Sequence, residues 1–264
     1  MNDKKIPFVG LHAHSVAGSI FDAIGYPDEH MDFCYENGGE ALALTDHGNM
    51  NGFSHQFLHW QKMKAEGKEF KPIFGVEAYF IPSIEEWQEE YDRIKADAKL
   101  AKTLAKAGDT SGATVEDEEA SKKAVKSVIN RRRHLVLLAQ NQTGLNNLFK
   151  LISESYKEEN FYRYPRVDYK LLDKYSEGVI ASSACLGGPY AGNYWANREE
   201  GPEAVMDAMR ETSRRFVEIF GDRWHGELQW NNIPEQHELN QYIIKVCKEF
   251  DITLISTADS HYPN

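Results

Sequence analysis

The chain has 264 residues, of which 41% are hydrophobic and 27% are charged, and its formal net charge is −11. These values are typical of a globular domain with a sizeable core, and the acidic excess argues against sequence-independent binding of duplex DNA through a basic face. Cys34, Cys185 and Cys247 are widely spaced and form no CxxC pair, which argues against a disulfide framework and indicates a reducing, cytoplasmic location. We expect no signal peptide and no membrane-spanning helix.

Apolar runs that read as strands alternate with helical segments along the chain. The predicted strands cover residues 8–13, 40–45, 72–81, 134–139, 178–183, 226–230 and 252–257. The predicted helices cover residues 27–37, 51–65, 143–156, 202–220 and 234–250, most of them bounded by proline or glycine. Strand–helix alternation predicts a mainly parallel sheet. We expect an α/β fold, a distorted (β/α)7 TIM-like barrel formed by residues 1–264 as a single domain.

Residues 83–133 interrupt this alternation. They read as two long polar helices, the first opened by a capping box at Ser83 and Glu86, with a glycine-containing turn at residues 108–112. Few apolar residues occur at helical spacing, which predicts only partial docking on the barrel. We interpret this segment as a helical-hairpin insertion on the surface.

Polar clusters follow three of the predicted strands. His12 and His14 lie at the end of the first strand, and residues i and i+2 of extended backbone point to the same side, so both imidazoles should meet at one point. His47 follows the second strand in the stretch 45–47, and residues 258–261 follow the last strand. These positions predict a polynuclear metal site at the rim of the barrel, although each cluster alone could be a strand end hydrogen-bonded to its neighbours. Asp46, beside His47, could be an outer partner that orients an imidazole.

Glu77 lies inside the apolar third strand, where a carboxylate is costly unless it is paired or binds metal. Imidazole and carboxylate together suit zinc, manganese or iron. Cys185 follows the fifth strand and could be a ligand or a small core residue. His134 opens its strand, so a simple barrel would put it at the opposite rim. The arginines at 131–133 could meet a phosphate, but a solvated helix end is the favoured interpretation.

Six stretches of the sequence together resemble one family, the polymerase and histidinol phosphatase (PHP) superfamily. Within it, the chain is most similar to the N-terminal domain of the C-family polymerases, the bacterial DNA polymerase III alpha subunits. The resemblance covers nearly the whole chain outside the helical segment. The stretches that carry it are residues 11–15, 44–52, 71–77, 134–144, 182–188 and 258–262.

The resemblance implies a metal site and an activity. The family's metal ligands fall on His12, His14, Asp22, His47, Glu77, His134, Cys185, Asp259 and His261. It implies up to three divalent ions (Zn2+, Mn2+ or Fe2+), with His12, His14, Glu77, His134, Asp259 and His261 acting in catalysis through them. The loop after His14 departs from the family pattern: it is one residue longer before Asp22 and lacks the glycine that should follow.

The function implied is metal-dependent hydrolysis of phosphoesters, as a 3′–5′ exonuclease or proofreading activity in DNA replication. The implied partners are single-stranded DNA or a primer 3′ end, remaining polymerase domains and other replisome subunits. Polymerase palm, thumb and fingers are absent from the sequence, so we expect either a domain of a longer protein or a stand-alone relative. Two alternatives stay open: a phosphatase acting on a small phosphomonoester, and a non-catalytic module stabilised by metal that docks a proofreading subunit.

Overall fold

The computed structural model of the chain describes residues 8–106 and 115–263. The first residues of the chain and the predicted turn at 108–112 lie outside this range. Within it, no helix combines the length and the apolar character needed to cross a membrane.

Seven strands form the main path of one sheet, in the order β1-β2-β3-β4-β7-β8-β9. They are β1 (Phe8–Gly10), β2 (Gly39–Leu44), β3 (Lys71–Phe80), β4 (Arg133–Ala139), β7 (Val179–Ser182), β8 (Trp224–Gln229) and β9 (Thr253–Thr257). The segments that follow the first and last strands meet at a parallel bridge between Ala13 and Ser260. The His14 amide donates to the Ser260 carbonyl at 2.8 Å, and the Ser260 amide donates to the His12 carbonyl at 3.2 Å. The sheet is therefore a nearly closed barrel, and the predicted fold class is confirmed.

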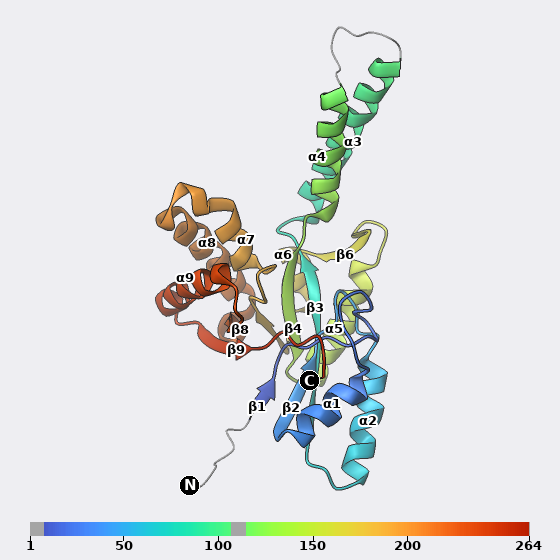
Figure 1. The fold of residues 1–264 in the computed structure, drawn as a ribbon, viewed down its shortest axis with the longest axis vertical. Helices are drawn as coiled ribbons and strands as arrows, with labels where there is room; N and C mark the ends of the chain where they lie inside the picture. The colour runs from blue at the N-terminus through green and yellow to red at the C-terminus, as the bar shows by residue number, and fades with distance from the viewer. Residues whose placement is uncertain (1–7, 107–114, 264) are drawn as a thin grey trace.

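One strand runs against the predicted parallel sheet. The pairs β1–β2, β2–β3, β7–β8 and β8–β9 are parallel, but β4 is antiparallel to both β3 and β7. The cause is the helical segment between β3 and β4, which returns the chain to the end of the sheet where β3 finishes (Figure 1). His134 consequently pairs with Tyr79, near the end of β3. The start of β4 thus lies at the same rim as the ends of its neighbours, which removes the difficulty with His134.

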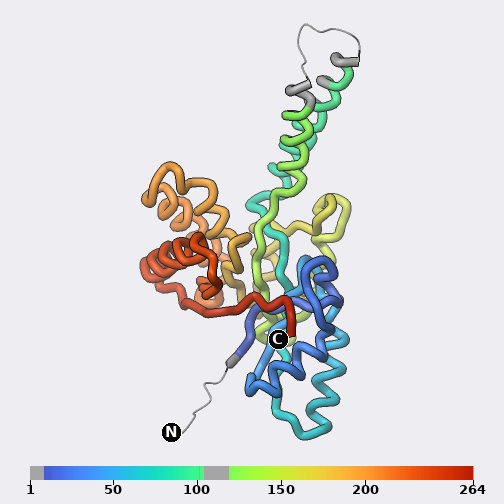
Figure 2. Tube along the Cα trace, in the orientation of Figure 1, coloured from blue at the N-terminus to red at the C-terminus, as the bar shows by residue number. Residues whose placement is uncertain are grey.

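The helical segment consists of α3 (Ile84–Lys106) and α4 (Val115–Asn130). The Ser83 hydroxyl accepts from the Glu86 amide at 3.2 Å, which is one of the two contacts of the predicted capping box. Figure 2 shows the two helices side by side and extending away from the barrel. Only their near end is docked, through a small buried cluster in which the Trp87 indole donates to the Val128 carbonyl at 2.9 Å.

The remaining helices cover the sheet. They are α1 (Pro27–Glu36), α2 (Phe53–Ala65), α5 (Gln142–Ser155), α6 (Tyr169–Tyr175), α7 (Pro189–Asn197), α8 (Pro202–Phe220) and α9 (Pro234–Phe250). The largest core cluster lies between the sheet and several of these helices, and in it the rings of Phe216 and Trp224 stack with centroids 4.1 Å apart. The sequence did not predict α6, α7, or the short strands β5 (Phe161–Tyr162) and β6 (Tyr164–Val167).

Candidate metal centre

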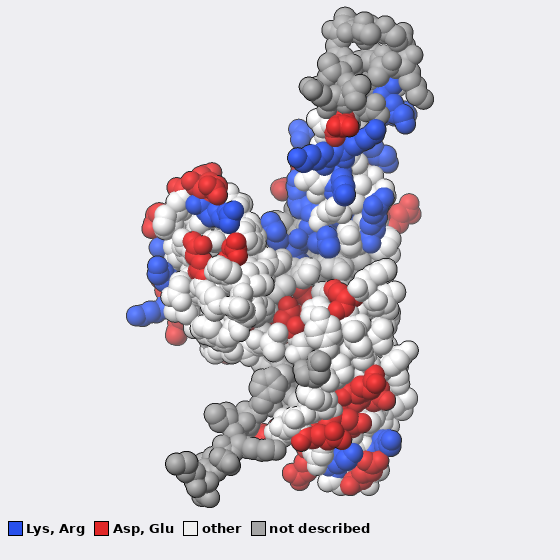
Figure 3. All heavy atoms as spheres, viewed as in Figure 1, with Lys and Arg blue, Asp and Glu red and all other residues white. Residues whose placement is uncertain are grey.

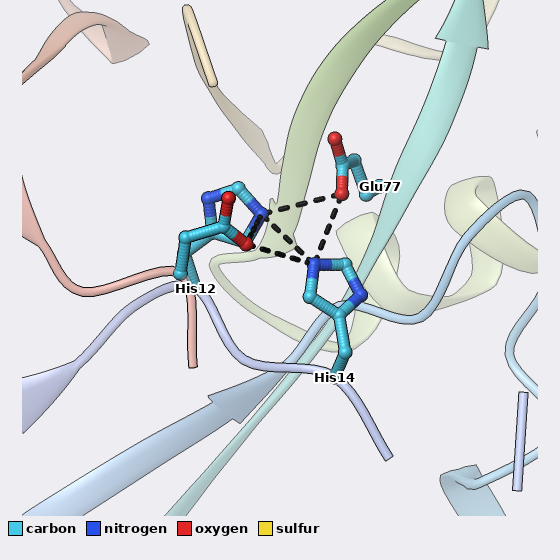
Figure 4. A group of neighbouring side chains, drawn as sticks. His12, His14 and Glu77 are labelled. Atoms are coloured by element: carbon cyan, nitrogen blue, oxygen red, sulfur yellow. Dashed lines mark hydrogen bonds and ion pairs between the residues drawn. The ribbon is translucent and has the colours of Figure 1, made fainter. Parts of the chain in front are cut away.

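Four side chains from the first and last segments of the barrel and from β3 meet at one point. The ligand atoms of His12, His14, Glu77 and Asp259 all lie within 4.8 Å of one another. The Nε2 atoms of His12 and His14 are 3.3 and 3.0 Å from Oε2 of Glu77. Both are also 3.1 Å from Oδ1 of Asp259. Figure 4 shows the two imidazoles and the Glu77 carboxylate pointing toward one another, as predicted for the His-x-His pair.

A second group shares the same carboxylate. The ligand atoms of His47, Glu77 and His134 lie within 4.8 Å of one another. His47 is positioned by a parallel bridge to Glu77, and its Nδ1 is 3.1 Å from Glu77 Oε2. His134, at the start of β4, contacts Glu77 Oε1 through Nδ1. Glu77 therefore stands between two groups of possible ligands.

The other three predicted residues lie at the border of these groups. Asp22 Oδ2 is 3.0 Å from His47 Nε2, so the longer loop still brings Asp22 to the cluster. His261 Nε2 is 3.4 Å from Asp259 Oδ1. Cys185 Sγ is 3.6 Å from Nδ1 of His134. The structure thus brings all nine predicted side chains into one contiguous cluster.

Asp46 holds the loop that follows His14. It does not orient His47; its Oδ1 accepts from the Ser15 amide at 2.6 Å and from the Ser19 hydroxyl at 2.9 Å, and its Oδ2 accepts from the Ser15 hydroxyl at 2.8 Å. Ser19 in turn lies 3.3 Å from Nδ1 of His14. Asp46 therefore acts on the imidazole of His14, through Ser19 and the loop that follows His14.

Sequence reasoning missed Glu227, a fully buried carboxylate in β8. Its Oε1 is 2.6 Å from Nδ1 of His12, on the opposite side of the imidazole from Glu77. It also accepts from the hydroxyls of Ser182 and Thr257, each at 2.5 Å. Such a carboxylate fixes the ring orientation and the tautomer of a histidine that binds metal through its other nitrogen. The available signal was the one that marked Glu77, a lone acid within a buried strand.

Burial and charge oppose each other at these residues. Burial disfavours the charged form of His12, but the carboxylates of Glu227 and Asp259 raise its pKa well above the usual value. Burial likewise opposes protonation of His14, yet hydrogen bonds to Asp259 and Glu77 raise its pKa to about 9. Burial alone would raise the pKa of Glu77, but His134, His12 and His14 lower it well below its usual value. In the absence of other cations, the carboxylates therefore favour the protonated forms of His12 and His14.

The donor set fits divalent metal ions. Oε1 of Glu77 and Nδ1 of His47 are buried and make no hydrogen bond with any described residue, although imidazole or carboxylate atoms lie at ion-pair distance. One carboxylate cannot hydrogen-bond well to four imidazoles at once, whereas ions between them would satisfy every donor atom. Histidine, carboxylate and thiolate are also the ligands that zinc and related ions select. Burial, with Glu77 and Asp259 nearby, raises the pKa of the Cys185 thiol, so that thiol must lose a proton before it binds metal.

Without metal, the protein should lose stability as the pH rises above neutrality. His14 has a folded-state pKa of about 9 against an ordinary value of 6.5. Because the pKa of His14 is higher in the folded state than in the unfolded state, its protonation stabilises the fold. This stabilisation is complete below pH 6.5 and is lost as the pH rises to about 9, which amounts to about 3 kcal/mol. Thermal denaturation in a chelator should show a falling melting temperature across this interval. A flat or rising curve would contradict the assignment of His14 as an imidazolium.

The loop that carries Cys185 depends on glycine at position 188. The Gly188 amide donates to the Cys185 carbonyl at 2.8 Å, and a Cβ on Gly188 would lie 1.8 Å from the Ser183 carbonyl oxygen. Since backbone atoms make this contact, Gly188→Ala must displace the loop, and we expect a loss of about 1–3 kcal/mol, as in overpacked sites. Urea denaturation measures the change. An unchanged midpoint would show that the loop accommodates a side chain.

The fold and the cluster define a class of protein: an α/β barrel whose rim gathers histidine, carboxylate and thiol side chains able to hold metal ions. The family model for the PHP domain matches residues 10–230, and the chain belongs to this family.

The chain is similar to several DNA polymerase III alpha subunits. The chain is 38% identical over 257 residues to the DNA polymerase III subunit alpha of Aquifex aeolicus. It is 34% identical over 257 residues to that of Borreliella burgdorferi. Each match covers 97% of this chain and 18% of the relative, so the chain spans less than a fifth of their length. Among solved structures, a candidate metal-dependent phosphoesterase from Bifidobacterium adolescentis matches with a TM-score of 0.45 and 15% identity, over 97% of this chain and 88% of that one.

Proposed function

We propose that this chain is a metal-dependent phosphoesterase that removes nucleotides from the 3′ ends of DNA during replication. The observation that carries the proposal is the pair of ligand groups that share Glu77. Two ions held a few ångströms apart are a common arrangement in enzymes that cleave phosphoesters. The similarity to DNA polymerase III alpha subunits supports DNA as the substrate.

In this proposal, the predicted residues hold up to three ions of zinc, manganese or iron. His12, His14, Glu77 and Asp259 form the more buried group, and His47, Glu77 and His134 form the second. Asp22, Cys185 and His261 complete the set at its border. When bound, such ions lower the pKa of a water molecule to near neutrality and stabilise the charge of the phosphoryl group.

The protein's own residues have separate tasks. Glu227 holds His12 in one orientation through the 2.6 Å contact at Nδ1. Ser15, Ser19 and Asp46 hold the loop that carries His14. His261 is partly exposed and lies next to Asp259, which suits it to pass a proton to the leaving oxygen.

The proposal also places the chain in a larger assembly. We propose that residues 1–264 act as one domain, that residues 83–133 are an insertion in it, and that it works in the cytoplasm with polymerase domains and other replisome subunits. The length of the relatives supports this context, since each alpha subunit extends far beyond the matched segment.

The direct test uses the purified chain loaded with manganese or zinc. We expect a single-stranded oligonucleotide labelled at its 5′ end to shorten stepwise, and the same label to stay on full-length DNA in chelator. A small aryl phosphate in parallel reactions tests the phosphomonoesterase alternative. If the protein binds metal, shown by elemental analysis, and cleaves neither substrate, the catalytic proposal fails and a stabilising metal site remains.

A further inference from the structure

Arg132 is a cation held beside the metal cluster by aromatic rings. It lies two residues before His134, and its guanidinium carbon is 3.9 Å from the ring centroid of Tyr164 and 5.1 Å from that of Tyr79. The Tyr79 ring in turn stacks on His47 at 6.2 Å and lies 5.8 Å from His134. One aromatic ring therefore separates the guanidinium from two residues of the cluster.

Arg132 has no carboxylate partner among the described residues. Its Nη1 donates to the Asn130 carbonyl at 3.0 Å, and its buried Nε makes no hydrogen bond within the described part of the chain. The neighbouring arginine differs: Arg131 forms a bidentate pair with Glu90 at 2.5 and 3.0 Å. The part-buried guanidinium of Arg132 therefore has donors left for an external anion.

The surroundings of Arg132 suit a nucleotide of a single strand, with its phosphate at the guanidinium and its base on a tyrosine ring. The two tyrosine rings hold the guanidinium in place, and its donors beyond the one bound to the Asn130 carbonyl can contact phosphate oxygens. The part-buried rings of Tyr79 and Tyr164 provide aromatic faces of the kind on which single-stranded bases stack. Figure 3 shows lysine and arginine side chains gathered over α3 and α4, and acidic side chains over α1 and α2. A polyanion approaching this face would thus be favoured on the side of Arg132.

We propose that Arg132 binds a backbone phosphate of single-stranded DNA next to the phosphate that is hydrolysed. The inference rests on the proposed function. In it, Arg132 is the residue that causes the protein to prefer an oligonucleotide to a small phosphomonoester. The scissile phosphate belongs to the cluster of ligands, while Arg132 lies beyond Tyr79, outside that set. A substrate with only one phosphate would not reach both the ligand cluster and Arg132.

The test compares Arg132→Gln with Arg131→Gln in the full, metal-loaded chain. Anisotropy of a labelled single-stranded thymidine oligonucleotide with hydrolysis-resistant phosphorothioate linkages should show Kd raised about tenfold or more by Arg132→Gln, because a charge-assisted hydrogen bond is lost. The dependence of log Kd on log salt should flatten by about 0.7, the value for one phosphate contact on a single strand. Arg131→Gln, which removes a charge already paired with Glu90, should change neither quantity.

Activity and a second variant complete the experiment. For hydrolysis of the oligonucleotide, Arg132→Gln should raise KM with little change in kcat, and hydrolysis of a small aryl phosphate should not change. Arg132→Lys should restore the salt slope but only part of the affinity, since lysine keeps the charge but lacks the paired N–H donors of the guanidinium. Equal effects of the two glutamine variants on binding, or equal loss on both substrates, would overturn the inference. If the binding results are as expected but the protein cleaves neither substrate, Arg132 binds DNA as proposed and the catalytic proposal is rejected.

Discussion

Glu77→Gln should empty the metal site and abolish hydrolysis. Both groups of ligands use this carboxylate, so the loss of metal affinity should exceed the about 100-fold that follows removal of a group that only orients a ligand. In chelator the variant should be less stable by about 3–5 kcal/mol, because breaking a buried ion pair leaves uncompensated charge. Elemental analysis, denaturation in urea and the oligonucleotide assay measure the three effects.

The same substitution elsewhere provides the control. Glu40 lies on the neighbouring strand β2 and is exposed, so Glu40→Gln should leave metal content, stability and hydrolysis unchanged. If Glu77→Gln retained the full amount of bound metal, Glu77 would not be a shared ligand, and the proposed arrangement of the site would be wrong.

Glu227→Gln should lower metal affinity or hydrolysis about 10- to 100-fold, the range for groups that orient a histidine ligand. Glutamine keeps the shape of the side chain but loses the charge that holds Nδ1 of His12 at 2.6 Å. Glu227 would contact no ion itself, so metal should still bind at high concentration and restore part of the activity. Titration with a competing chelator gives the metal affinity. The value of kcat at saturating metal then shows whether activity is lost because His12 is misoriented or because the metal site is empty.

Ser182→Ala is the matched control for this variant. It removes one donor to Glu227, at 2.5 Å, and leaves the contact between Glu227 and His12 in place. We expect an effect smaller than that of Glu227→Gln on both quantities. If the two variants were equal, the role of Glu227 would be to support local structure rather than to position His12.

The sequence was sufficient to place the strands but not their directions. All seven strands of the main sheet path were predicted, most of them from apolar runs, because strands covered on both faces are continuously apolar. The direction of β4 depends on the route that α3 and α4 take between strands, and periodicity carries no information about that route. The missed β5 has only two residues, too few to show a pattern.

The candidate site shows a similar division. His12, His14, His47, Glu77 and Asp259 were identifiable because polar groups at strand ends or inside apolar strands are conspicuous. Family resemblance identified Asp22 as a candidate ligand. It also favoured a ligand role for Cys185 and His134, which their spacing alone had left open. Glu227 and the true partners of Asp46 were missed because each contact joins segments distant in sequence, and only tertiary structure brings such segments together.

Closure of the barrel has a consequence for how the protein folds. The contact between His14 and Asp259 spans 245 positions in sequence, and that between His12 and Glu227 spans 215. Contacts of such long range slow folding, because the loop entropy is lost before the contact is gained. The proposed ligands therefore assemble only when both ends of the sheet are in place, and a metal ion bound by them would stabilise the finished fold over partly folded forms. Refolding without metal should consequently populate open barrels, which expose the edges of β1 and β9 to pairing with other chains.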